Sequence, residues 1–151
     1  MPFTLVVPKE YPLVILACVI LAIQGFCYTF YVIKHRAKAF NKEFINGKCK
    51  PMHDEGRKDN EKKLPFNVHE NGFPDGGDGR YSEKLSYKDW YLVNQAVRAH
   101  HHFVEMLPAV VAVLAISGLV LPYATVVIAY LTIFFKLVSI FTIAYANEGF
   151  D

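Results

Sequence analysis

Long apolar stretches and one polar segment alternate along this sequence. From Tyr11 to Ile33 there is no Asp, Glu, Lys or Arg, and from Phe103 to Ala146 the only such residues are Glu105 and Lys136. A helix of about 20 apolar residues is long enough to span the hydrocarbon core of a bilayer. The pattern therefore predicts an all-α integral membrane protein whose helices form a bundle.

We expect a single membrane domain over residues 1–151 with three transmembrane helices, near 11–35, 88–118 and 122–146. Pro122 separates the last two helices, because a proline can begin a helix but interrupts one that is already running. The polar start of the second helix indicates that this helix projects out of the bilayer. A chain with two spans and a re-entrant segment is the alternative.

The surroundings of the first apolar run indicate a retained helix and its orientation. The run is longer than the hydrophobic region of a signal peptide, and no small-residue cleavage site follows it. Basic residues follow at once: Lys34, Arg36, Lys38 and Lys42. By the positive-inside rule this end faces the cytoplasm or the mitochondrial matrix. Three spans then place the C-terminus on the same side as the polar segment.

The overall composition conceals this separation of charge. The chain is 53% hydrophobic and 20% charged, with a formal net charge of +2, values that a soluble protein could share. Yet all 16 Lys and Arg residues except Lys9 and Lys136 lie between Lys34 and Arg98. A water-soluble fold has no reason to separate its charges in this way. No nucleic-acid partner is expected.

The long polar loop, residues 36–87, is rich in glycine, proline and charges of both signs. Its run from Asn71 to Gly79 is typical of turns and coil. Its apolar residues are too few to form a core: Leu64, Phe66, Val68, Phe73 and Tyr81. Such a segment should be disordered when alone. If it is ordered, we expect other membrane protein subunits to contact the 36–87 loop. The other expected partner of the chain is the lipid bilayer.

The candidate chemistry lies where the second helix enters the membrane. At about 100° per residue, four polar residues share one stripe of that helix: Asn94, Arg98, His102 and Glu105. Charges at the membrane edge are costly unless they are paired. One interpretation is an Arg98–Glu105 network that locks a helix bundle. The other is a pocket for an anionic, peptide-like ligand, in which Arg98 holds a carboxylate and Glu105 an amine.

Metal and disulfide chemistry receive little support. His101 and His102 precede Glu105 by helical spacings that a metal could use. However, adjacent histidines point in different directions, and no second cluster of ligands accompanies them. The three cysteines, Cys18, Cys27 and Cys49, form no CxxC motif. We therefore predict no metal site and no disulfide framework.

The second helix also carries an ordered motif: Asn94, Arg98, Ala99-His100, Glu105 and Pro108. Lys9-Glu10-Tyr11 precedes the first apolar helix, and a basic segment from Lys34 to Phe44 follows it. In these features the chain resembles the family of membrane-associated proteins in eicosanoid and glutathione metabolism (MAPEG). Within that family the likeness is greatest to the type-three microsomal glutathione transferases.

The resemblance implies a fold and a site. The family consists of trimers of four-helix bundles that bind glutathione between subunits. On this basis Arg98 would grip glutathione, Glu105 would lie beside it, and Asn94 and His100 would flank the site. His102 stands where the family has Asn. Arg98, Glu105, Asn94 and His102 are therefore the candidates for a residual glutathione-type site.

Departures from the family pattern bear on catalysis. Met106 stands where an aromatic residue is common, Lys136 aligns with a family Arg, and Ser139 replaces a Tyr. The family's fourth helix, which in one member brings an Arg to the glutathione thiolate, has no counterpart before Asp151. A thiol with a pKa of about 8.5 needs a nearby positive charge to ionise at neutral pH. The activating half of the site is therefore expected to be lost.

Two functional hypotheses follow. The favoured one is a degenerate glutathione-transferase-like protein with no catalytic residues, which serves as a structural or accessory subunit of a larger membrane complex. The alternative is a microsomal glutathione S-transferase or peroxidase, a homotrimer that conjugates glutathione to lipid-soluble electrophiles. The resemblance implies a mitochondrial membrane or the endoplasmic reticulum for either.

Overall fold

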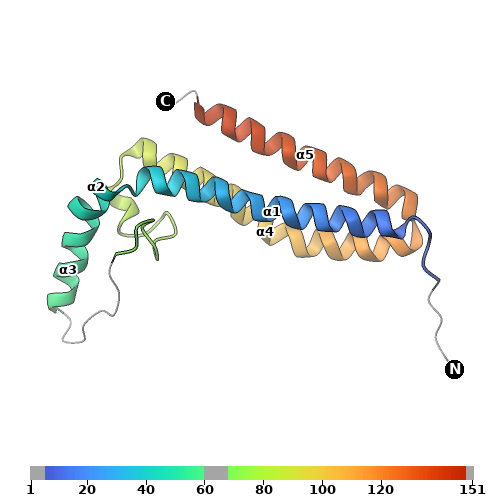
Figure 1. Ribbon diagram of the computed structural model, residues 1–151, viewed down its shortest axis with the longest axis horizontal. Helices are drawn as coiled ribbons and strands as arrows, with labels where there is room; N and C mark the ends of the chain where they lie inside the picture. Colours follow the sequence, from blue (N-terminus) through green and yellow to red (C-terminus); the bar gives the residue numbers. More distant parts are fainter. Residues whose placement is uncertain (1–5, 60–67, 149–151) are drawn as a thin grey trace. The chain divides into compact units, whose positions relative to one another are not determined.

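The computed structural model describes residues 6–59 and 68–148, and within them all regular structure is helical (Figure 1). Three of the described helices are long and apolar enough to cross a membrane: α1 (Tyr11–Ala39), α4 (Tyr87–Val120) and α5 (Pro122–Glu148). The predicted all-α membrane fold is thus confirmed. All three helices run slightly past their expected ends.

Two prolines have different effects on the membrane helices. Pro108 lies inside α4 without ending it, since membrane helices tolerate the loss of one backbone donor. Pro122 is the first residue of α5, where its missing N–H needs no partner. The Thr125 hydroxyl closes the turn by donating to the Leu121 carbonyl at 2.9 Å, and it lies 3.1 Å from Ser117 Oγ. The turn between α4 and α5 is therefore a hydrogen-bonded corner.

The described chain divides into two compact units, and α1 and α4 each take part in both. The span unit comprises the residues up to Cys27 and those from His102 onward, and the loop unit comprises Tyr28–His101. The span unit has a buried apolar core: Val14, Ala17, Cys18, Leu21, Leu114, Ala129 and Ile133. At Gly25 an added Cβ would lie 2.8 Å from the Phe103 ring, so glycine permits a close approach there.

Polar side chains in the span unit bond to backbone carbonyls of neighbouring helices. The Tyr11 hydroxyl donates to the Ala115 carbonyl at 3.2 Å, and Gln24 Nε2 donates to the Ile133 carbonyl at 3.2 Å. In a bilayer no water is available to satisfy such groups, so they must bond within the protein. These two bonds connect α1 to α4 and α1 to α5.

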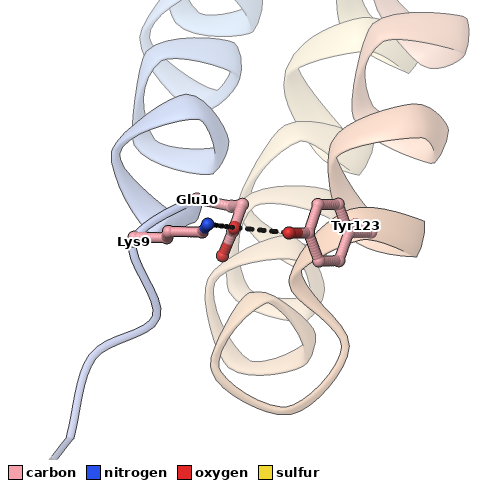
Figure 2. A network of polar contacts seen from close by, with 3 residues as sticks. All are labelled: Lys9, Glu10 and Tyr123. Atoms are coloured by element: carbon pink, nitrogen blue, oxygen red, sulfur yellow. Dashed lines mark hydrogen bonds and ion pairs between the residues drawn. The ribbon is translucent and has the colours of Figure 1, made fainter.

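A third polar contact lies at the start of α1 (Figure 2). The Tyr123 hydroxyl, from the first turn of α5, donates to Glu10 Oε1 at 2.7 Å, and Lys9 Nζ lies 3.7 Å from the same oxygen. The Tyr123 hydrogen bond is the main reason why the pKa of Glu10 lies below its usual value. The beginnings of α1 and α5 are therefore joined through an ionised carboxylate at neutral pH.

The loop unit contains several short helices. After α1 come α2 (Lys42–Phe44), the π-helical turn η1 (Ile45–Cys49) and α3 (Lys50–Asp59), and the 3₁₀ turn η2 (Ser82–Lys84) precedes α4. Asn41 caps α2, because its side-chain oxygen accepts the Phe44 N–H at 2.9 Å. Much of the 36–87 segment that we expected to be coil is thus helical.

The expectation that this segment has no core is wrong for its described part. A buried apolar cluster forms from Ala39, Phe40, Ile45, Val93 and Val97, with Val68, Tyr81 and Leu85 packed against it. Val93 and Val97 come from the first turns of α4, and the other residues named here lie within 36–87. The loop therefore supplies much of its own core and completes it against α4. Leu64 and Phe66 lie outside the described residues.

The glycine-rich turn, residues 71–82, is organised by the buried carboxylate of Asp75. Its two oxygens accept five hydrogen bonds of 2.8–3.0 Å, from the N–H groups of Gly77, Gly79, Tyr81 and Ser82 and from the Ser82 hydroxyl. Burial alone would raise the pKa of Asp75, but these hydrogen bonds outweigh it and hold the pKa below its usual value. The turn is therefore ordered around an ionised side chain.

Arg36 joins this turn to the end of α1. Its guanidinium donates to the Asn71 carbonyl at 2.9 and 3.2 Å and to the Asp75 carbonyl at 2.6 Å. The rings of Phe40 and Phe73 lie 5.1 and 4.4 Å from the guanidinium carbon, within cation–π range. The order of the loop thus has a source inside the chain, and this order does not by itself require a partner subunit.

Candidate functional site

The four residues of the predicted stripe lie on one unbroken helix, α4. Arg98, His102 and Glu105 are exposed, and Asn94 is half-buried. Within residues 6–59 and 68–148, neither Arg98 nor Glu105 forms an ion pair or a hydrogen bond. The charges that the sequence singled out are therefore available to a partner outside this chain, and such pairing stays a prediction.

Asn94 has a structural role that the sequence did not reveal. Its Nδ2 donates to the Gly77 carbonyl and, at 3.0 Å, to the Trp90 carbonyl one turn back along α4. Gly77 has a φ of +114°, a conformation that favours glycine. The side chain that was expected to flank a ligand thus fixes the glycine-rich turn to α4.

The three consecutive histidines differ in their surroundings. His100 is half-buried, and its Nδ1 is shielded from solvent with no hydrogen-bond partner among the described residues. The His100 and His101 rings are 6.2 Å apart, and His101 and His102 are exposed. In the described parts of the chain, no three His, Cys, Asp or Glu side chains come together as metal ligands.

A cavity of about 460 Å³ lies in the span unit between α4 and α5. His102 from α4 and Lys136 and Ser139 from α5 are its main polar lining residues, with Leu131 and Phe135 among its apolar ones. This cavity brings His102 together with Lys136 and Ser139, the two α5 positions at which we expected departures from the family pattern. A cation, an imidazole and a hydroxyl in an apolar slot are groups that can hold a small anion or a polarised thiol.

Lys136 is already engaged within this unit. Its Nζ lies 5.1 Å from the centroid of the buried Phe103 ring, a cation–π contact. Such a contact stabilises the ammonium group in apolar surroundings and holds it against α4. The charge at this cavity is therefore positioned by an aromatic ring on the neighbouring helix.

The loop unit holds a second group of ionisable side chains, at Cys49, His53, Asp75 and Tyr81. The Tyr81 hydroxyl lies 3.5 Å from His53 Nδ1. Burial, and then the charge of Asp75, raise the pKa of the fully buried Cys49 thiol. Burial likewise raises the pKa of Tyr81, with smaller effects from Cys49 and Asp75. Cys49 is therefore a neutral, inert thiol rather than a nucleophile.

Comparison with known families assigns residues 14–149 to the MAPEG family. The match covers most of the chain, including all of α4, so this membrane protein belongs to that family. The family resemblance seen in the sequence is thus confirmed, while the likeness to the type-three transferases stays a prediction. No curated protein and no solved structure matches the chain.

Proposed function

We propose that this MAPEG-family chain is a non-catalytic accessory subunit of a larger membrane assembly. The observation that carries the proposal is the exposure of Arg98 and Glu105 on α4, where neither has a partner among the described residues. An unpaired charge costs on the order of 2.5–3.5 kcal/mol at the centre of a membrane helix on the lenient insertion scale, and a smaller penalty of the same kind applies at the membrane edge, where these residues are expected. A neighbouring subunit that supplies one opposite charge to each residue removes that cost.

Three features of the structure support the loss of catalysis. Asn94 donates its amide to the Gly77 carbonyl, Lys136 contacts Phe103, and Ser139 offers an aliphatic hydroxyl where the family has a tyrosine. Removing one preorganised donor from a developing anion typically costs about 2.7–4 kcal/mol, or roughly 10²–10³ in rate. We propose that the membrane is mitochondrial or that of the endoplasmic reticulum.

A second candidate is a glutathione transferase or peroxidase, most simply a homotrimer. It is favoured by the cavity where His102, Lys136 and Ser139 come together. In that role Lys136 would stabilise the glutathione thiolate, and lipid-soluble electrophiles would reach the cavity from the bilayer. Glutathione is then the cosubstrate, with Arg98 and Glu105 as binding residues.

One experiment on the intact chain separates the two candidates. The tagged protein is extracted in mild detergent and analysed by native electrophoresis and mass spectrometry, with Arg98→Met tested against Lys84→Met, an exposed cation outside the stripe. We expect an assembly with unlike subunits that Arg98→Met weakens and Lys84→Met does not. A homotrimer that both variants leave intact would contradict the accessory role.

An activity assay tests the same proposal independently. With glutathione and 1-chloro-2,4-dinitrobenzene at neutral pH, we expect no turnover above the uncatalysed rate. Thiolate absorbance that appears on mixing the protein with glutathione, and that Arg98→Ala abolishes, would restore the transferase. Lys84→Ala is the matched control for that variant.

A further inference from the structure

The loop unit contains a cavity of about 430 Å³ that has no part in the proposed function. On one side it is lined by Met52, His53 and Gly56 of α3, and on the other by the turn that includes Pro74, Arg80 and Tyr81. None of the stripe residues Asn94, Arg98, His102 and Glu105 lines it. Its volume lies within the range typical of small-molecule pockets, about 300–1,000 Å³.

The walls of this cavity suit a flat, apolar group. Met52 contributes a flexible thioether, Pro74 a rigid ring and Tyr81 an aromatic ring. Thioethers make favourable contacts with aromatic rings, and aromatic side chains stack on one another. These three side chains come from two segments of the chain, α3 and the glycine-rich turn.

The polar groups of the cavity favour a negative charge. Asp75 lines the cavity too, but both its oxygens are occupied by the five hydrogen bonds of the turn, and Arg36 lies against its carbonyl. The carboxylate of Asp75 is therefore committed to the turn and is not free to bind a ligand. Arg80 is exposed and forms no ion pair within the described residues, so its positive charge is available to a ligand in the cavity.

His53 provides a second polar group. Its Nε2 is shielded from solvent and has no hydrogen-bond partner among the described residues, although buried polar groups in folded proteins are nearly always satisfied. Its Nδ1 faces the Tyr81 hydroxyl at 3.5 Å. If that hydroxyl donates to Nδ1, the ring proton is on Nε2, which is then a donor that needs an acceptor.

We propose that this cavity binds a small aromatic anion, with a carboxylate or a phosphate as its charged group. The ring lies among Met52, Pro74 and Tyr81. The anion pairs with the exposed Arg80 guanidinium, and the His53 ring forms part of the cavity wall. This site is separate from any glutathione site and from any subunit contact at the stripe.

Isothermal titration calorimetry on the full chain in nanodiscs, with empty nanodiscs subtracted, tests the proposal. The probes are 2-naphthoate, 2-naphthyl phosphate and the neutral 2-naphthamide. The affinities of the first two identify the preferred anion, and comparison with the third gives the contribution of the negative charge to the affinity. We expect one or both anions to bind at least tenfold more tightly than the amide. Arg80→Gln should weaken anion binding about tenfold or more, because a charge-assisted hydrogen bond is lost. Lys84→Gln, on the same turn but outside the cavity, should change it less than twofold.

A second pair of variants tests the location of the site. Gly56 lines the cavity, and a Cβ added there meets no atom within 4 Å, so Gly56→Leu should fill the space and abolish binding. Gly47 is an equally open position outside the cavity, and Gly47→Leu should bind as the parent does. Circular dichroism of both variants confirms that they fold. Equal binding of the amide and the anions, or anion binding that survives Gly56→Leu, would overturn the proposal.

Discussion

Replacing Asp75 by Asn should open the glycine-rich turn. The side chain keeps its shape, but one acceptor oxygen becomes an NH₂ donor that faces N–H groups. Oδ2 accepts from Tyr81 and Ser82, so an amide nitrogen in its place leaves at least these two buried donors without partners. Each unsatisfied donor costs about 1–3 kcal/mol. Local opening of the turn should therefore become easier by about 2–6 kcal/mol.

Hydrogen–deuterium exchange measures this opening directly. A loss of about 2 kcal/mol accelerates exchange roughly 30-fold, so peptides that contain Tyr81 and Ser82 should exchange at least that much faster in Asp75→Asn. Asp78→Asn, at an exposed aspartate in the same turn, is the control and should exchange as the parent does. Unchanged protection in Asp75→Asn would refute the view that this carboxylate organises the turn.

The pH dependence of the same turn follows from the lowered pKa of Asp75. In the unfolded chain the carboxyl group titrates near its usual pKa of about 3.9. The stabilisation is therefore fully present above that pH and is lost as the pH falls through the lower, folded-state pKa. After correction for intrinsic exchange rates, protection should be equal at pH 7 and pH 5 and should decline only below about pH 4.

Two further predictions concern the span unit. Tyr123→Phe removes the main cause of the lowered pKa of Glu10, so the pKa of that carboxyl should rise toward its usual value. Carbon-13 NMR of labelled glutamate measures this pKa. The control variant Tyr130→Phe should leave it unchanged. Gly25→Leu forces a side chain against the buried Phe103 ring, 2.8 Å from the new Cβ, and should destabilise the span unit by about 1–3 kcal/mol. Gly47→Leu meets no such contact, so a fall in the melting temperature as large as that of Gly25→Leu would contradict this explanation.

The membrane helices could be predicted from sequence because their signal is local. The apolar run that begins at Tyr11 and the proline at position 122 mark a helix by length and position alone. The motif on α4 likewise lies within one helix, so the resemblance to the family could be seen without any knowledge of tertiary contacts. Features of this kind need only the order of residues along the chain.

The loop unit could not be predicted because its order depends on distant contacts. Arg36 binds carbonyls 35 and 39 residues further along the chain, and Asn94 binds one 17 residues back. A glycine-rich run with a single buried carboxylate looks like coil until its N–H groups are seen to converge on that carboxylate. The cavity beside α3 could not be predicted for the same reason. Its walls come from segments about 20–30 residues apart, and a flexible connection of that length does not fix the distance between its ends.

The burial of Arg36 has a consequence for the biosynthesis of the chain. Arg36 leaves the ribosome well before Asn71 and Asp75, whose carbonyls it binds in the folded protein. During insertion of α1 we therefore expect it to be a hydrated cation that contributes, with its basic neighbours, to the orientation of the helix. Once the turn closes over it, Arg36 is only 2% exposed. On this view one residue acts first as a topology signal and later as a cross-link. We therefore expect a substitution there to affect both the fraction of chains inserted correctly and the folding of those chains.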